Sequence, residues 1–208
     1  VLGHAAVARH PARGRPERAE VDLPGDALRA RAAAEERLDR TKDPRRRAIL
    51  SCLRDHLLAE ATGNFELLLS TLAPDPHYHF WIDGSGFGGG PRGLAAVRSH
   101  YEQLFEEGRS VCEYDIDRIV VDDDVIVTEG FFDQLFPGHV LRKRGAAVDD
   151  PEAVYSHRMR LLLIWPFDAQ ARLIGEDSYA NGAMYLPENL RKLSPAEIPA
   201  VYYERLRR

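Results

Sequence analysis

The sequence predicts an α+β domain in which helices pack against an antiparallel sheet. Apolar residues recur at helical spacing through the first half of the chain, and the period changes to two after Gly108. The later strands follow one another through short turns, as in a hairpin meander. Such connections exclude a doubly wound parallel sheet, because parallel neighbours need long crossovers.

Size and charge narrow the classes of function. The 208 residues suffice for one domain with its own core and an appendage. A net charge of -5 argues against nucleic acid or an anionic membrane as a partner, since both need a local excess of Lys and Arg. No secretion signal is visible in the first residues, and the longest apolar stretch, Leu161 to Phe167, is too short to cross a bilayer. We therefore expect a cytoplasmic protein, in which Cys52 and Cys112 are reduced, buried thiols.

Three segments differ in composition. Residues 1–42 are expected to form a flexible N-terminal tail followed by a polar helix rich in Ala, Arg and Glu. Residues 43–185 carry the patterns of a folded domain, with a loop at 137–153. Residues 186–208 are expected to be a C-terminal tail of short helical pieces on the surface.

Helix signals are clearest at the start of the predicted domain. Asp43 followed by Pro44 is a typical N-terminus, because Asp caps the first turn and Pro has no N–H to satisfy there. Gly63 ends this helix, and Asn64 caps a shorter one. A third helix is expected from Leu94 to Phe105.

Strand signals follow two rules, aromatic or β-branched content and alternation. The strands are expected in HYHFWID, after Gly108, in VIVTEGFFDQLF, from Tyr155 to Leu163 and in LIGEDSY. In the long strand after Gly108, alternation places Cys112, Tyr114, Ile116 and Val120 on one face and Glu113, Asp115 and Asp117 on the other. Arg158 and Arg160 are expected to pair with this acidic face from a neighbouring strand.

The order of elements resembles the nuclear transport factor 2-like superfamily over roughly residues 45–182. The resemblance lies in a leucine-rich helix ending LLSTLAPD, a strand closing on Asp83, a glycine loop, and GLAAVRSHY from Gly93 to Tyr101. The superfamily includes ketosteroid isomerase, scytalone dehydratase, limonene epoxide hydrolase and the SnoaL-like polyketide cyclases. The resemblance implies a cone-shaped curved sheet wrapped by three helices around a pocket, no cofactor, and a homodimer.

Candidate catalytic residues also come from this resemblance. Asp83 stands where ketosteroid isomerase has its proton-shuttling aspartate, although an aspartate before Gly84 and Ser85 also suits a simple turn cap. His56 stands where that enzyme carries a tyrosine that binds the oxyanion, although one histidine on an apolar helix face is more often a core residue. Tyr101 matches a supporting tyrosine on the third helix.

Further residues complete the expected pocket. His79 and His157 are expected to face inward and could polarise a carbonyl group, as His56 could. Asp177 lies near the position of a catalytic aspartate in limonene epoxide hydrolase, and no counterpart of the isomerase's second acid is found. The walls are expected to be aromatic, formed by Tyr78, Trp81, Tyr114, Phe132 and Trp165.

Two short motifs match other kinds of binding site, one for a dinucleotide and one for a metal ion, but the sequence around them supports neither. The run from Gly84 to Gly89 matches the dinucleotide fingerprint, but Gly90-Pro91-Arg92 separates it from the next helix and no βαβ unit follows. His77 and His79, with Asp83 four residues later, resemble a metal-ligand spacing. The expected fold does not require a metal, and we predict none.

These observations lead to two hypotheses about function. The first is a cofactor-free acid–base enzyme of the isomerase, cyclase or dehydratase kind, acting on a hydrophobic carbonyl compound such as a polyketide or a steroid-like ring. The second is a module of the same fold that binds a small ligand or dimerises without catalysis. The position of Asp83, His79 and His56 around one cavity separates the two hypotheses.

Overall fold

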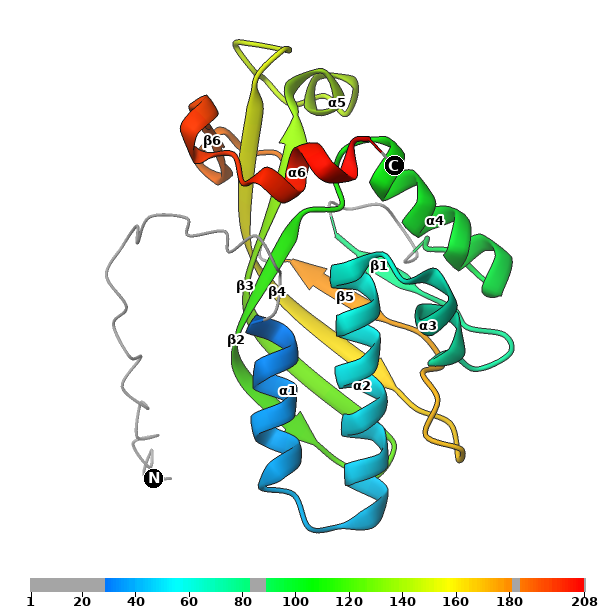
Figure 1. Ribbon diagram of the computed structural model, residues 1–208. Coiled ribbons are helices and arrows are strands. Elements are labelled where there is room, and N and C mark those ends of the chain that lie inside the picture. Colours follow the sequence, from blue (N-terminus) through cyan, green and yellow to red (C-terminus); the bar gives the residue numbers. More distant parts are fainter. Residues whose placement is uncertain (1–28, 83–88, 181–183, 208) are drawn as a thin grey trace, which may run out of the picture.

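The computed structural model describes residues 29–82, 89–180 and 184–207 (Figure 1). The helices are α1 (Arg29–Asp39), α2 (Pro44–Thr62), α3 (Phe65–Ser70), α4 (Leu94–Glu106), α5 (Gly138–Lys143) and α6 (Ala200–Arg205), with 3₁₀ turns η1 (Pro187–Asn189) and η2 (Pro195–Glu197). The strands are β1 (His79–Trp81), β2 (Cys112–Val121), β3 (Val125–Pro137), β4 (Val154–Pro166), β5 (Asp177–Ala180) and β6 (Leu190–Lys192).

The strands form one curved sheet in the order β1-β5-β4-β3-β2, and β6 pairs with β4. All neighbours are antiparallel except β1 and β5, which run parallel at the short edge of the sheet. In Figure 1, α1 and α2 lie side by side across the lower part of the sheet, and α4 lies above α3. The predicted order of helix, helix, strand, helix and antiparallel meander is confirmed.

The signals at the two ends of α2 act as expected. The Asp43 side chain accepts a hydrogen bond from the N–H of Arg46, at 2.9 Å, and Pro44 occupies the first helical turn. Gly63 ends the helix in the left-handed region, with φ of 68°, where a β-carbon is unfavourable. A β-carbon at Gly63 would also lie 2.5 Å from the ring of Phe105 on α4, so this glycine sets how closely α4 approaches α2.

A β-bulge changes the faces of β2. The register against β3 shifts between Ile116 and Arg118, which leaves Asp117 as the extra residue. Alternation therefore reverses beyond this point, so that Val120 is 54% exposed and Val121 is buried. The prediction that Val120 shares the inner face with Cys112 and Tyr114 was wrong, because uniform alternation does not include a bulge.

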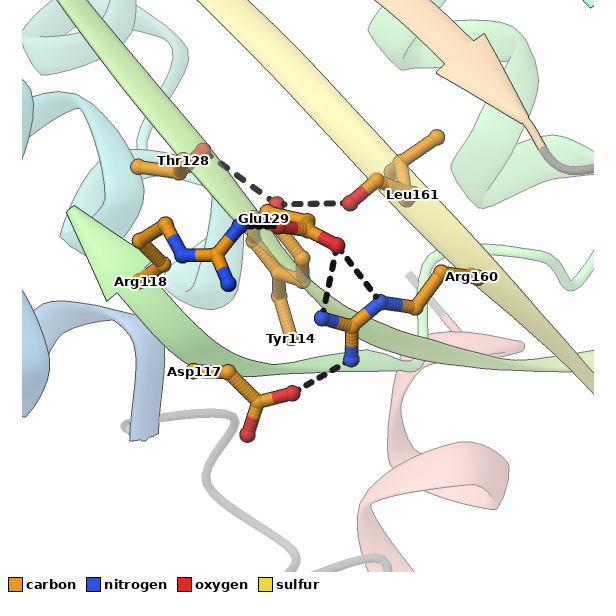
Figure 2. Close-up of polar contacts among 7 residues, drawn as sticks. All are labelled: Tyr114, Asp117, Arg118, Thr128, Glu129, Arg160 and Leu161. Carbon is orange, nitrogen blue, oxygen red and sulfur yellow. Dashed lines mark hydrogen bonds and ion pairs between the residues drawn. The ribbon is translucent and has the colours of Figure 1, made fainter. Parts of the chain in front are cut away.

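Arginines pair with acidic side chains on the outer face of the sheet (Figure 2). Arg160 on β4 binds Asp117 on β2 and also Glu129 on β3, the latter at 2.8 Å from Nη2 to Oε1. Arg118 donates to the other oxygen of Glu129 at 2.5 Å. The expected contact between Arg160 and Asp117 is present, but it reaches across β3, which lies between β2 and β4.

Two segments, one expected to be a loop and the other a surface tail of short helical pieces, pack as parts of the domain. Residues 138–143, within the expected loop, form α5. In the segment expected to be a surface tail, β6 extends the sheet, and α6 buries Tyr202 and Arg205. The Arg205 guanidinium donates hydrogen bonds to the backbone carbonyls of Ala61 and Ser110, which joins the C-terminal segment to α2 and to the start of β2. Among the described residues, no helix is both long enough and apolar enough for a membrane span.

Candidate active site

A cavity of about 640 Å³ lies between the helices and the inner face of the sheet. That volume is typical of a small-molecule site. Most of the lining is apolar or aromatic and comes from α2, α4, the short strand β1 and the long strands: Leu57, Phe80, Leu104, Phe132, Met159, Leu161, Leu163 and Trp165 among others. The remaining lining residues carry polar or charged groups: Glu60, Tyr78, His100, Tyr101, Gln103, Arg109, Ser110, Tyr114, Gln134, Arg144, Glu176, Ser178 and Tyr185.

A hydrogen bond to Thr71 fixes the orientation of the His56 ring. Its imidazole is fully buried on α2, and Nδ1 lies 2.7 Å from the hydroxyl oxygen of Thr71. That hydroxyl donates to the carbonyl of Leu68 at 2.6 Å, so it accepts the hydrogen bond from His56, and Nδ1 carries the proton. The other ring nitrogen, Nε2, then faces the Tyr78 hydroxyl and the Glu60 carboxylate, each at 3.4 Å.

Glu60 lies one turn after His56 on α2, so both side chains share one helix face. The hydroxyl of Tyr101 on α4 donates a short hydrogen bond to Glu60 Oε1. Burial, together with the Glu60 charge, raises the pKa of Tyr101 well above its ordinary value, and burial does the same to the pKa of Tyr78. Both tyrosines therefore keep their protons at neutral pH and act as hydrogen-bond donors.

A second carboxyl group of the cavity, that of Glu176, has an oxygen within 4.8 Å of a Glu60 oxygen. Glu176 directly precedes β5, and the Ser178 hydroxyl donates to its Oε1 at 2.9 Å. Burial and the nearby charge of Glu60 raise the pKa of Glu176 to about 8, although the Ser178 hydrogen bond opposes this effect. Glu176 thus holds a proton at neutral pH, beside a carboxylate that accepts hydrogen bonds.

His56, Glu60 and Glu176 could together hold a divalent cation. One ligand atom from each residue lies within 4.8 Å of the other two, and one imidazole with two carboxylates suits several divalent ions. In the part of the chain that the structure describes, no other group of three such side chains is this close. The spacing noted at His77 and His79 brings their rings within 4.0 Å, but the third member, Asp83, lies outside the described residues.

The residues predicted on β1 and β5 divide between the two faces of the sheet. Tyr78, Phe80 and Ile82 line the cavity, whereas His79 and Trp81 alternate with them and do not. The Nδ1 of His79 lies 2.6 Å from Oδ1 of Asp177, which is likewise absent from the lining. The expectation that His79, Trp81 and Asp177 face the pocket chose the wrong parity of these strands, because the residues that line the cavity here are Glu176, just before β5, and Ser178 within it.

The other predicted residues are placed as follows. Tyr101 lines the cavity, as do four of the five expected aromatic walls: Tyr78, Tyr114, Phe132 and Trp165. The Tyr114 hydroxyl lies 3.2 Å from both the Thr128 hydroxyl and the Leu161 carbonyl (Figure 2). His157 is fully buried beside the cavity and is not part of its lining; its Nε2 lies 2.5 Å from the Met184 carbonyl, and burial lowers its pKa. Asp83 lies outside the described residues.

Several polar residues of the cavity were not predicted. Glu60 had a usable signal, since it follows His56 by four residues on an otherwise apolar face. Glu176 had a weaker signal, the alternation with Asp177, which needs the facing direction of β5 to be known. Arg109 and Arg144 had none, because both lie at the ends of elements whose packing is set by distant parts of the chain.

Comparison with known proteins agrees with this architecture. A family model described as SnoaL-like domain matches residues 53–157, half of the chain, from α2 to β4. The chain belongs to the SnoaL-like domain family. A search of curated proteins finds no match.

Solved structures resemble this SnoaL-like domain in fold at low sequence identity. A protein from Shewanella putrefaciens CN-32, provisionally named a SnoaL-like polyketide cyclase, has a TM-score of 0.53 and 12% identity, covering 74% of this chain and 88% of its own. A protein from Shewanella denitrificans OS-217 with the same provisional name has a TM-score of 0.51 and 14% identity, covering 64% of this chain and 90% of its own. The predicted nuclear transport factor 2-like fold is thereby confirmed.

Proposed function

We propose that this SnoaL-like domain catalyses proton transfer on a small, largely apolar carbonyl compound, as an isomerase, cyclase or dehydratase does. The observation that carries the proposal is the pair of carboxyl groups, Glu60 and Glu176, in the wall of a mostly apolar cavity. A protonated carboxyl beside a deprotonated one offers a general acid and a general base in one place.

The proposed step is an enolisation. The Glu60 carboxylate takes a proton from the carbon next to the carbonyl group, while the Glu176 carboxyl gives its proton to the carbonyl oxygen. A C–H bond breaks, an O–H bond forms, and an enol results. In a conjugated enol, Glu60 returns the proton to the far carbon and the enol O–H proton goes back to Glu176, which gives an isomer. Attack of the enol carbon on a second carbonyl group gives a ring: a C–C bond forms, the proton on Glu60 goes to the new alkoxide, and the enol O–H proton returns to Glu176. Tyr101 positions the Glu60 carboxylate through its short hydrogen bond, while His56 Nε2 can accept a hydrogen bond from the Tyr78 hydroxyl.

Asp83 remains the alternative base, as the family resemblance predicts. Hydrogen–deuterium exchange separates the candidates: cyclic ketones are incubated with the purified protein in D₂O, and loss of the α-proton signal is followed by NMR. We expect Glu60→Gln and Glu176→Gln each to slow the enzyme-dependent exchange by about a hundredfold or more. Asp83→Asn should change it by less than a factor of about three if Glu60 is the base.

The matched control is Asp55→Asn, which removes a half-buried carboxylate that pairs with Arg54 on the same helix as Glu60. Its exchange rate should equal that of the wild type. A rate in Glu176→Gln equal to that of the wild type would eliminate the proposed acid. Ketones that bind in the cavity but exchange no faster than in buffer would instead support the second hypothesis, a module that binds a small ligand without catalysis.

A further inference from the structure

A buried arginine faces the same cavity. Arg109, between α4 and β2, is 8% exposed and belongs to the cavity lining. Its Nε donates to Oε2 of Glu107 at 2.6 Å, and its guanidinium lies 5.8 Å from the centre of the Phe136 ring. Among the described residues, the side chain of Arg109 has no other hydrogen-bond acceptor. The outer N–H groups of a nearly buried guanidinium are therefore left without a partner from this part of the chain.

A second arginine shares the same counter-ion. Arg144, which follows α5 and also lines the cavity, donates from Nη2 to the same Oε2 of Glu107 at 2.9 Å. One carboxylate thus balances two guanidinium groups, and the cluster of Arg109, Arg144 and Glu107 carries a net charge of about +1. Burial and the charge of Arg144 lower the pKa of Arg109, although Glu107 opposes this effect. One further negative charge would therefore neutralise this cluster.

Besides Glu107, the polar side chains around this cluster are the hydroxyl of Tyr185, which interacts with both arginines, the amide of Gln134 and the imidazole of His100. The Gln134 side-chain amide donates to the backbone carbonyl of Arg109 at 2.7 Å, which fixes the backbone there. His100 also lines the cavity, and burial together with Arg109 lowers its pKa, so that it is neutral. An anionic group of a bound molecule would meet the free N–H donors and complete the charge balance.

We propose that Arg109 and Arg144 bind a carboxylate of the ligand. A monoanion matches the net charge of the cluster, and the two outer nitrogens of a guanidinium suit the two oxygens of a carboxylate. The apolar walls between this cluster and the Glu60–Glu176 pair hold the body of the molecule. The ligand class is thus an apolar acid. That its reacting carbonyl group lies at the carboxyl pair rests on the proposed function, whereas the carboxylate site does not.

The test compares two probes of nearly equal shape, neither of which contains a ketone that the proposed reaction could enolise. These are 1-naphthaleneacetate, which is an anion, and 1-naphthaleneacetamide, which is neutral. We expect the wild type to bind the anion at least about tenfold more tightly at low salt, as measured by calorimetry. Arg109→Gln should abolish this preference and leave the affinity for the amide within about twofold. The matched control is Arg92→Gln, which removes an arginine with 67% side-chain exposure. This control should bind the anion in preference to the amide as the wild type does.

A second variant covers the case in which Arg109→Gln fails to fold. Glu107→Gln keeps both arginines and removes their counter-ion, so it should bind 1-naphthaleneacetate several-fold more tightly than the wild type does. Equal binding of anion and amide by the wild type would overturn the inference, as would a preference that survives Arg109→Gln or weaker anion binding by Glu107→Gln. 1-Naphthyl phosphate binding more tightly than the carboxylate would also overturn it. None of these outcomes depends on proton exchange, so they are distinct from failure of the proposed function.

Discussion

The Nδ1 of His56 lies 2.7 Å from the Thr71 hydroxyl oxygen, and that hydroxyl donates its only proton to the Leu68 carbonyl. This chain of hydrogen bonds determines which nitrogen of the buried ring carries a proton. Thr71→Val keeps the shape of the side chain but leaves His56 Nδ1–H without an acceptor. We expect it to lower the free energy of unfolding by about 1–3 kcal/mol, as measured by urea denaturation.

Thr71→Ser keeps the hydroxyl and should recover most of that loss. The matched control is Thr62→Val at the exposed end of α2, where the hydroxyl donates only to the Leu58 carbonyl at 2.8 Å and to Ala59. This control should cost less than about 0.5 kcal/mol. Equal destabilisation by Thr71→Val and Thr62→Val would contradict the assigned role of Thr71.

In the proposed mechanism, Tyr101 acts on Glu60 rather than on the substrate. Its hydroxyl donates to the Glu60 carboxylate, and such a bond stabilises the charged form. We expect Tyr101→Phe to lower the kcat of ketone proton exchange by about tenfold and to leave KM within about twofold of the wild type. Tyr203→Phe, which changes a tyrosine that is 45% exposed, should leave both constants unchanged. A raised KM with an unchanged kcat would show that Tyr101 binds the substrate and would contradict this positioning role.

The elements of this domain were predictable where a local signal determines them. Asp43, Pro44 and Gly63 define the ends of α2 through hydrogen bonds and backbone angles that depend on a few neighbours. The face of Val120 was not predictable, because the bulge at Asp117 arises from the pairing of β2 with β3. Alternation alone carries no information about an inserted residue.

The site was predictable only in part for a related reason. His56 and Tyr101 lie on helices, where the apolar face identifies the inward side. The short strand β1 has aromatic residues at both parities, and at β5 two carboxyl residues, Glu176 and Asp177, stand next to each other, so either face could be inward. Glu176 meets Glu60 because β5 pairs in parallel with β1 and places Glu176 beside the cavity. That pairing joins segments almost a hundred residues apart, which local patterns cannot specify.

Both thiols should be unreactive in the folded protein. The structure has Cys52 and Cys112 as free cysteines, and burial raises the pKa of Cys52 to about 11 and that of Cys112 to about 12. Because the thiolate is the reactive form, we expect iodoacetamide at pH 8 to label native protein at least about a hundredfold more slowly than protein unfolded in urea. Mass spectrometry measures both rates. Cys112 lines the cavity, and its rapid labelling would contradict the raised pKa that burial gives this thiol.

The bulge in β2 requires a glycine on the facing strand. A β-carbon at Gly130 would lie 2.1 Å from the backbone carbonyl oxygen of Asp115, a contact that no side-chain rotation relieves. We expect Gly130→Ala to lower the free energy of unfolding by about 2–4 kcal/mol. Gly89→Ala is the matched control, since a β-carbon there meets nothing within 4 Å. Gly130→Ala as stable as the wild type in urea would show that β2 and β3 pair differently.

The raised pKa of Glu176 gives a signed dependence of stability on pH. The folded state holds the proton up to a pKa of about 8, whereas the unfolded chain releases it near the ordinary value of 4.5. The contribution of Glu176 to stability is therefore fully present below about pH 4.5 and is lost as pH rises through about 8. Glu176→Gln cannot titrate. As pH rises from 5 to 8, the free energy of unfolding of the variant should therefore increase by about 2–4 kcal/mol relative to that of the wild type.

Urea denaturation of both proteins at pH 5, 6.5 and 8 measures this change, because all other titrating groups are common to the pair. Glu66→Gln on α3 is the control, since that carboxylate is 85% exposed and should give a difference from the wild type that does not change with pH. A constant difference for Glu176→Gln would mean that Glu176 is already ionised at pH 5 in the folded protein. The proposed general acid would then have no proton to give at neutral pH, and the roles of Glu60 and Glu176 would have to be reversed or abandoned.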